Sequence, residues 1–363
     1  MYIRLASLII AFTSVFSSIL DAQRTANAPL YTTQLVAVEP DVRLEVVDWG
    51  GTGPALILLA GLGNDAHIFD TFAHNFTAHN HVYGITRRGF GASSKPSPTI
   101  ENYNADRLGD DVLSVMATLH LDNPVLAGHS IAGEELSSIG SRYPDKVSGL
   151  IYLDASNGFA YYDKSHGDTT LDIIDLKKRI EVLQVSGPGS SPHFFQNMLA
   201  SVVQVENDLR QALKLDEALP SSPQPTSTQA PLPAIPMAIA FGEQKYTHIS
   251  APILAIVAVP HDLGNVFKDN PGARAAVLAD DLARTSEQAN AFETGVPSAH
   301  VVRLHNAGHY IFVSNEAEVV RIMSEFLRNL QIRGALGVDR LTGSQSAFQP
   351  QLPVWKSSSS TTP

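Results

Sequence analysis

The residues most able to do chemistry lie in the segment Gly128-His129-Ser130-Ile131-Ala132-Gly133. The apolar residues 124–127 precede it and a helix-like segment at 134–142 follows it, which predicts a strand, a tight turn and a helix with Ser130 at the apex. The small residues on either side suit such a turn, because its backbone is strained and larger side chains would collide there. Ser130 is therefore a candidate nucleophile, although a serine in this place could also simply cap the helix.

A serine hydroxyl becomes a good nucleophile only when a base takes its proton, and histidine is the usual base. His309 lies in a loop directly after a predicted strand at 301–304 and before a predicted helix at 315–330. His305 lies four residues earlier and is a competing candidate. We predict that His309 is the base.

The base in turn needs an anionic group that orients it and stabilises its charged form. Asp262 follows a buried-strand pattern at 252–258, and Asp154 closes another at 150–153. Both carboxylates would stand at the carboxyl end of a strand. We predict Asp262 as the acid and keep Asp154 as the alternative.

These motifs together resemble the α/β-hydrolase fold family, of the kind with a helical cap, over residues 35–330. The chain order Ser130, Asp262, His309 is the order of nucleophile, acid and base in that family. The resemblance implies that all three side chains project from the carboxyl ends of strands in one mostly parallel sheet. It also implies a serine hydrolase of the esterase type.

Two further loops carry the resemblance. Residues 60–63, Ala-Gly-Leu-Gly, resemble the family's oxyanion loop, and residues 88–93 resemble its Arg-Gly-x-Gly-x-Ser loop. The resemblance implies that the backbone N–H groups of Leu62 and Ile131 form the oxyanion hole. Arg88 is interpreted as a scaffold residue that holds its own loop.

The chain departs from the family pattern at several positions. Ala132 stands where the family usually has glycine, and Ala60 replaces a common histidine. Thr86-Arg87 replaces a pair that usually contains aspartate, and Asp262 follows its strand one residue later than is typical.

The order of elements predicts an α/β fold, with a mostly parallel central sheet flanked by helices and an inserted helical cap. Helical patterns at 66–78, 106–119 and 134–142 separate the strands. After residue 156 the apolar residues recur at helical spacing instead, and residues 219–236 are rich in proline, serine and threonine, which predicts an irregular strap. The expected units are a signal peptide at 1–22, a catalytic domain at 27–155 and 250–333, a cap at 156–249 and a disordered tail at 334–363.

A cap over the nucleophile would choose the substrate through its inward side chains. Four aromatic residues of the predicted cap are candidates for that pocket: Tyr161, Tyr162, Phe194 and Phe195. Their apolar rings suggest an apolar acyl or alcohol group.

Composition excludes several classes of function. The net charge of -11 disfavours nucleic acid, and the absence of cysteine excludes disulfides, thiolate catalysis and cysteine-based zinc sites. His79 and His81 have no third ligand beside them, so we predict no metal site, and no motif predicts a cofactor.

The N-terminus matches a secretory signal. Residues 5–20 are uncharged and follow Arg4, and cleavage is expected after Ala22. We therefore expect a secreted or periplasmic protein with no stable membrane insertion after cleavage. An uncleaved anchor is the alternative, and the oligomeric state is not predicted.

The expected function is a serine hydrolase that cleaves small, moderately hydrophobic carboxylic esters or lactones through an acyl-enzyme on Ser130. Two alternatives stay open. One is hydrolysis of a carbon–carbon bond or an amide with the same three residues, and the other is a ligand-binding protein that keeps the fold without catalysis.

Overall fold

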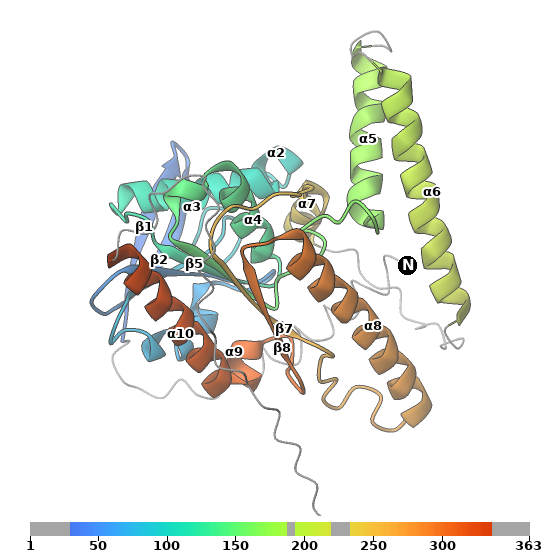
Figure 1. The fold of residues 1–363 in the computed structure, drawn as a ribbon. Coiled ribbons are helices and arrows are strands. Elements are labelled where there is room, and N and C mark those ends of the chain that lie inside the picture. The colour runs from blue at the N-terminus through green and yellow to red at the C-terminus, as the bar shows by residue number, and fades with distance from the viewer. Residues whose placement is uncertain (1–29, 187–192, 219–232, 336–363) are drawn as a thin grey trace, which may run out of the picture.

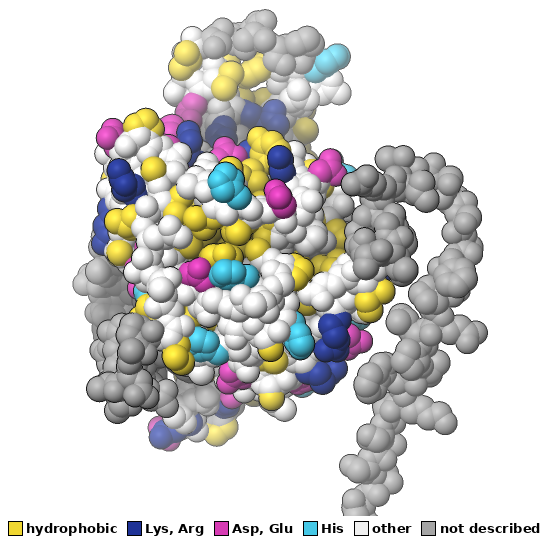
Figure 2. Space-filling model, turned by 90° about the vertical axis from the view of Figure 1, so that its left-hand side faces the viewer, with side chains coloured by type: hydrophobic (Ala, Val, Ile, Leu, Met, Phe, Trp, Pro, Cys, Tyr) yellow, Lys and Arg dark blue, Asp and Glu magenta, His cyan; other side chains and the backbone are white. Residues whose placement is uncertain are grey.

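The structure is a computed structural model that describes residues 30–186, 193–218 and 233–335. The predicted signal peptide at 1–22, most of the predicted tail and parts of the predicted cap lie outside the described residues. Within the described ranges, no helix is both long and apolar enough to cross a bilayer. On the face drawn in Figure 2, acidic and basic side chains are intermixed.

One eight-stranded sheet forms the centre of the molecule, in the order β1-β2-β4-β3-β5-β6-β7-β8 (Figure 1). The strands β3 to β8 run parallel, and β2 is antiparallel to both of its neighbours. Their bounds are β1 Thr32–Glu39, β2 Val42–Gly50, β3 Ala55–Leu59, β4 His81–Ile85, β5 Val125–His129, β6 Gly149–Leu153, β7 Ile253–Ala258 and β8 Ala299–Leu304. The predicted α/β class with a mostly parallel sheet is confirmed.

The central strands are apolar on both faces because both faces are covered. All residues of β5, β6 and β7 are buried. In β5, Leu126 joins the core on one side of the sheet, while Val125 and Ala127 join the core on the other side. This alternation is the two-residue period of a strand, and it explains why these strands read as continuous apolar runs.

Helices cover the two faces in separate groups. One face is covered by α3, α4 and α8, which contribute Val112, Leu136 and Phe292 to its core. The other face is covered by η2, η3, α9 and α10. The bounds are η2 Ala66–Phe69, η3 Phe72–Asn75, α2 Ile100–Tyr103, α3 Ala105–Thr118, α4 Ala132–Arg142, η4 Pro144–Lys146, α8 Pro271–Gly295, α9 Ile311–Ser314 and α10 Glu316–Ala335.

Three helices are inserted between β6 and β7: α5 Thr169–Ser186, α6 Phe194–Ala218 and α7 Ala234–Gly242. Figure 1 shows that α5 and α6 form a hairpin that extends away from the sheet. Its base is fixed by Asp172, whose carboxylate accepts hydrogen bonds from the Tyr162 hydroxyl at 2.7 Å and from Lys245 at 2.5 Å.

The structure corrects two local predictions. The helix expected at 66–78 is instead the pair of short 3₁₀ turns η2 and η3, which set the rings of Phe69 and Phe72 at 4.8 and 5.6 Å from that of Phe312 on α9. The irregular strap expected at 219–236 gives way to helix α7 from Ala234, because Pro236 falls in the first turn, where a helix needs no N–H donor. Residues 219–232 lie outside the described residues.

Candidate active site

Ser130 lies at a strained turn between β5 and α4. Its φ of 55° is in the left-handed region, and its N–H donates to the Leu153 carbonyl of the neighbouring strand at 3.2 Å. A Cβ added at Gly128 would lie 3.0 Å from the Cβ of Ala132, so the space between strand and helix admits only small side chains. The sharp turn inferred from the sequence is therefore present, and it costs about 1–2 kcal/mol for a residue other than glycine.

His309 reaches Ser130 from the loop after β8. Its Nε2 lies 2.9 Å from the Ser130 Oγ, and its Nδ1 lies 2.6 Å from Oδ2 of Asp154. Because a carboxylate only accepts, Nδ1–H donates to Asp154 and Nε2 is left to accept the serine proton. The three side chains form a chain of hydrogen bonds that can move a proton from serine to histidine.

The carboxylate beside His309 belongs to Asp154 and not to Asp262, which corrects the preferred acid. The Asp262 side chain is 53% exposed, and its Oδ1 accepts from the Gly264 N–H at 2.9 Å. The loop after β7 turns so that the preceding residue, His261, faces inward. The competing base His305 is exposed, and its Nδ1 contacts the Val259 carbonyl at 2.9 Å.

Asp154 is fixed from three directions. It follows β6 at a φ of 50°, its Oδ1 accepts from the Ala258 N–H at 2.9 Å, and its Oδ2 accepts from His309 and from His261 at 2.6 and 2.7 Å. Burial alone would raise the pKa of this carboxyl, but the charge of His261 and the two imidazole hydrogen bonds hold the pKa far below its usual range. Asp154 is therefore ionised at any pH at which the protein would be assayed.

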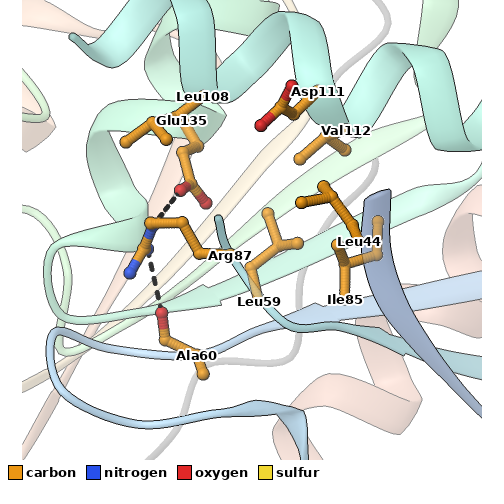
Figure 3. Close-up of a pocket in the computed structure, with 9 residues that line it drawn as sticks. All are labelled: Leu44, Leu59, Ala60, Ile85, Arg87, Leu108, Asp111, Val112 and Glu135. Atoms are coloured by element: carbon orange, nitrogen blue, oxygen red, sulfur yellow. Dashed lines mark hydrogen bonds and ion pairs between the residues drawn. The ribbon is translucent and has the colours of Figure 1, made fainter. Parts of the chain in front are cut away.

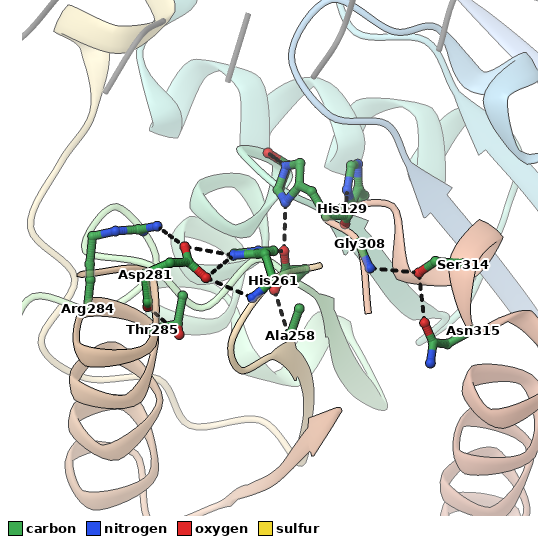
Figure 4. A network of polar contacts seen from close by, with 12 residues as sticks. His129, Ala258, His261, Asp281, Arg284, Thr285, Gly308, Ser314 and Asn315 are labelled. Atoms are coloured by element: carbon green, nitrogen blue, oxygen red, sulfur yellow. Dashed lines mark hydrogen bonds and ion pairs between the residues drawn. The ribbon is translucent and has the colours of Figure 1, made fainter. Parts of the chain in front are cut away.

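His261 connects Asp154 to helix α8. Figure 4 shows His261 beside Asp281 and Arg284 of that helix. The Nε2 of His261 contacts Asp154, and its Nδ1 lies 3.0 Å from Oδ1 of Asp281. Arg284, one turn further along α8, lies 2.5 Å from the same carboxylate. Burial lowers the pKa of His261, but the two carboxylates outweigh it and raise that pKa to about 10. Sequence reasoning missed His261 and Asp281.

His129 lies between Gly128 and Ser130 in the chain, and it contacts the backbone of His309. Its Nε2–H donates to the His309 carbonyl at 3.0 Å, and the two ring centroids lie 4.7 Å apart. Burial, with a smaller contribution from His309, lowers the pKa of His129 to about 3. The ring is therefore neutral, and it fixes the backbone of the base without adding charge to the site.

The loop after β3 passes directly over the nucleophile. A Cβ added at Gly61 would lie 3.2 Å from the Ser130 Cβ and 2.7 Å from Nδ1 of His129, so only glycine fits. Within residues 30–186, 193–218 and 233–335, the N–H groups of Leu62 and Ile131 have no hydrogen-bond acceptor. Two backbone N–H groups without an acceptor, one in the loop over Ser130 and one on the residue after it, are the type of donor set that an oxyanion hole requires.

Arg87 ties this loop to the helix that carries the nucleophile (Figure 3). Its Nη2 donates to the Ala60 carbonyl at 3.0 Å, and its Nε donates to Glu135 on α4. Both charged groups are almost fully buried. Sequence reasoning recorded Thr86-Arg87 only as a departure from the family pattern, which was the available signal. The neighbouring Arg88 pairs with Asp111 at 2.5 Å and with Glu39 at 2.6 Å, which confirms its scaffold role.

An apolar wall adjoins the oxyanion loop, and it differs from the predicted pocket. The side chains of Leu62 and Ile131 pack in one cluster with helix α7 of the insertion. The other members of this cluster are Phe90, Tyr103, Leu108, Phe159, Ile235, Ala238 and Ile239. The unbroken apolar run of α7 could have indicated it from the sequence, since a helix that is apolar all round is usually covered.

The four aromatic residues predicted for the pocket have other partners. Tyr161 packs edge-on against Phe292 of α8 at 6.2 Å, and the Tyr162 hydroxyl is bonded to Asp172. Phe194 lies on α6, in a hollow between the two hairpin helices, and Phe195 is 69% exposed on the same helix. Their places follow from the extended hairpin, which carries α6 away from the sheet.

Asp154, His261 and His309 have ligand-type atoms within 4.8 Å of one another, a spacing that can indicate a metal site. Hydrogen bonds of 2.6 and 2.7 Å from the two imidazoles to one carboxylate oxygen account for this grouping. These three side chains therefore hydrogen-bond to one another, and serine-based hydrolysis needs no metal ion at this site.

Comparison with known proteins agrees with the fold. A family model described as the alpha/beta hydrolase fold matches residues 54–207. Over 107 residues the chain is 34% identical to a fluoroacetate dehalogenase of Burkholderia, a match that covers 29% of this chain and 35% of that protein. Over 104 residues it is 25% identical to a 2-(acetamidomethylene)succinate hydrolase of Mesorhizobium japonicum, covering 29% and 36%. These matches span about a third of the length of each relative.

Among solved structures, a thermophilic esterase from Thermogutta terrifontis superposes with a TM-score of 0.51 at 19% identity. That alignment covers 82% of this chain and 99% of the esterase chain. At this identity the likeness shows the fold alone. The family model over residues 54–207, the sheet order and the superposition together show that the chain has the α/β-hydrolase fold.

Proposed function

We propose that the chain is a serine hydrolase that cleaves small, moderately hydrophobic carboxylic esters or lactones. The observation that carries this proposal is the unbroken chain of hydrogen bonds from Ser130 through His309 to Asp154. The N–H groups of Leu62 and Ile131 have no acceptor among the described residues, which supports the proposal because acyl transfer needs such donors for its oxyanion.

In the proposed reaction, His309 Nε2 takes the proton of the Ser130 hydroxyl while Oγ attacks the carbonyl carbon. The carbonyl oxygen becomes an oxyanion that the N–H groups of Leu62 and Ile131 stabilise, each by roughly 3 kcal/mol. His309 then gives its proton to the leaving alcohol oxygen, and the acyl group remains on Oγ. A water molecule attacks this ester, His309 takes the water proton, and the acid leaves as Oγ recovers its hydrogen.

A serine at position 130 favours attack on an acyl carbonyl over the dehalogenase and epoxide hydrolase reactions of some relatives. Haloalkane dehalogenases and epoxide hydrolases of this fold attack with a carboxylate, whereas position 130 is serine. The apolar wall formed by α7 and the oxyanion loop supports an apolar acyl or alcohol group beside the reacting carbon. Because α7 is contributed by the insertion, we propose that this segment acts as the cap.

A panel of nitrophenyl esters, lactones and anilides tests the proposal, with wild type, Ser130→Ala and the matched control Ser165→Ala. Ser165 is exposed on the insertion, and its Oγ is bonded to Asp163. We expect ester turnover to fall by about 10⁴-fold in Ser130→Ala and to stay unchanged in the control. Equal turnover in wild type and Ser130→Ala would refute the assigned nucleophile. Tight ester binding without turnover would indicate a binding protein, and preferential anilide cleavage would indicate an amidase.

A further inference from the structure

His261 lies in the loop after β7, next to Asp262, which the sequence analysis predicted as the catalytic acid. Its ring lies between two carboxylates that come from different elements. Nε2 lies 2.7 Å from Asp154, in the loop after β6, and Nδ1 lies 3.0 and 3.1 Å from the two oxygens of Asp281, on α8. The His261 backbone N–H also donates to Asp281 at 2.7 Å.

The contacts of His261 fix its protonation. An ionised carboxylate accepts hydrogen bonds and cannot donate them. With both carboxylates ionised, each ring nitrogen of His261 must therefore carry a hydrogen. The ring is therefore an imidazolium cation. This conclusion follows from the geometry, and the raised pKa of His261 agrees with it.

The surrounding groups place this charge next to the base. Among the described residues, the carboxylates of Asp154 and Asp281 pair with His261, and Arg284 lies 2.5 Å from Oδ1 of Asp281, the same oxygen that lies 3.0 Å from His261 Nδ1. Among the described residues, His309 is a further titratable neighbour, and its ring centroid lies 5.8 Å from that of His261. Oδ2 of Asp154 thus accepts hydrogen bonds from both His261 and His309, and the positive charge of His261 acts on His309.

We propose that His261 is a positioning residue that fixes the Asp154 carboxylate and, through its positive charge, keeps His309 in its neutral, proton-accepting form at lower pH than Asp154 alone would allow. The effect on His309 is electrostatic. Asp154 stabilises a proton on His309, and the nearby cation offsets part of that stabilisation. This inference rests on the proposed hydrolase function, because it concerns the base of that reaction.

The pH dependence of kcat/KM for a nitrophenyl ester tests the inference. His261→Gln keeps an amide that can donate to Asp154 but removes the charge, so we expect the acid limb of the profile to move to higher pH by about one unit. Asp281→Asn removes a negative charge from the other side of His261, so we expect its acid limb to stay or to move to lower pH. His305→Gln is the matched control, since His305 lies in the same loop as His309 and its Nδ1 contacts the Val259 carbonyl.

A purely structural role would lower kcat without moving the acid limb. The inference is therefore overturned if His261→Gln keeps the wild-type midpoint, or if Asp281→Asn moves it upward as far as His261→Gln does. If wild type turns over no ester, the proposed function fails instead, and the charge of His261 is still tested by nitrogen NMR of histidine-labelled protein at pH 7.5. We expect a signal from an imidazole with both nitrogens protonated in wild type that is missing from the spectrum of His261→Gln. Its absence from wild type would overturn the inference.

Discussion

On two flanks of Ser130, a loop of the proposed active site is connected to a helix by a cation, and the two cations differ. On the oxyanion flank, buried Arg87 joins the Ala60 carbonyl to Glu135 of α4. On the acid flank, His261 joins Asp154 to Asp281 of α8. On each flank, a cation bonded to a buried carboxylate connects an element of the proposed active site to a helix. An unpaired charge in either place would be costly, so both pairs hold the backbone firmly.

The difference lies in which cation each flank uses. A guanidinium keeps its charge across the pH range in which proteins fold, so the oxyanion loop is fixed at every working pH. An imidazolium can lose its proton, so the acid flank depends on pH. The comparison teaches that geometry at the oxyanion loop is constant, while the electrostatics beside the base can change.

The largest effect is expected where the acid flank meets the base. Asp154→Asn keeps the shape of the side chain but lets His309 adopt the wrong tautomer, and we expect kcat/KM to fall by about 10⁴-fold. Asp262→Asn is the matched control, because its carboxylate is exposed and bonded to Gly264. Ester hydrolysis by the two variants measures this difference. A larger loss in Asp262→Asn would mean that the geometry after β7 has been misassigned.

The oxyanion flank is expected to give the next largest effect. Arg87→Leu leaves Glu135 buried without its partner, so we expect a loss of about 3–5 kcal/mol in the free energy of unfolding and a fall in kcat of about 10–100-fold. The double variant Arg87→Leu with Glu135→Leu removes the unpaired charge. We expect the double variant to regain most of the lost free energy of unfolding in urea. Its kcat should stay low, since the Ala60 carbonyl still lacks the Arg87 donor. Recovery of the full rate would show that Arg87 does not position the loop.

Stability should show the pH dependence of the acid flank. The pKa of His261 is about 10 in the folded protein and near 6.5 when unfolded, so its stabilising contribution is complete below pH 6.5 and is lost as the pH rises through 10. We expect the Tm advantage of wild type over His261→Gln to shrink between pH 7 and pH 10. Thermal unfolding with His305→Gln as control measures it. An advantage that grew with pH would contradict the sign.

The smallest effects concern substrate choice. Ile235 lies on α7 in the apolar wall, and Ile235→Ala would enlarge the space beside the oxyanion loop. We expect KM for long acyl chains to fall by a few-fold relative to short chains, about 1 kcal/mol or less of altered binding. Phe195→Ala is the control, because Phe195 is largely exposed on the hairpin. KM values for nitrophenyl esters of increasing chain length compare the two variants. A larger change of KM in Phe195→Ala than in Ile235→Ala would support the pocket predicted from the sequence.

The two flanks also differ in how far the sequence could predict them. The sheet and the turn at Ser130 depend on local patterns of apolar residues and glycines, so the sequence could predict them. The oxyanion role of the loop at 60–63 came from the family resemblance and stays a prediction. The acid flank depends on residues far apart in the chain. Asp262 and His261 are neighbours, and which one faces His309 is decided by the pairing of His261 with Ala307, which no local pattern contains. Asp281 lies within α8, where a buried carboxylate looks like any other helical one.

The central claim is that Ser130 is a nucleophile activated by His309 and Asp154. Labelling with a fluorophosphonate probe tests it most directly, with mass spectrometry of the peptide that carries the label. The account predicts one adduct, on Ser130, that forms quickly in wild type and in Asp262→Asn and slowly in Asp154→Asn. An adduct on another residue, or equally fast labelling of Asp154→Asn, would contradict the account.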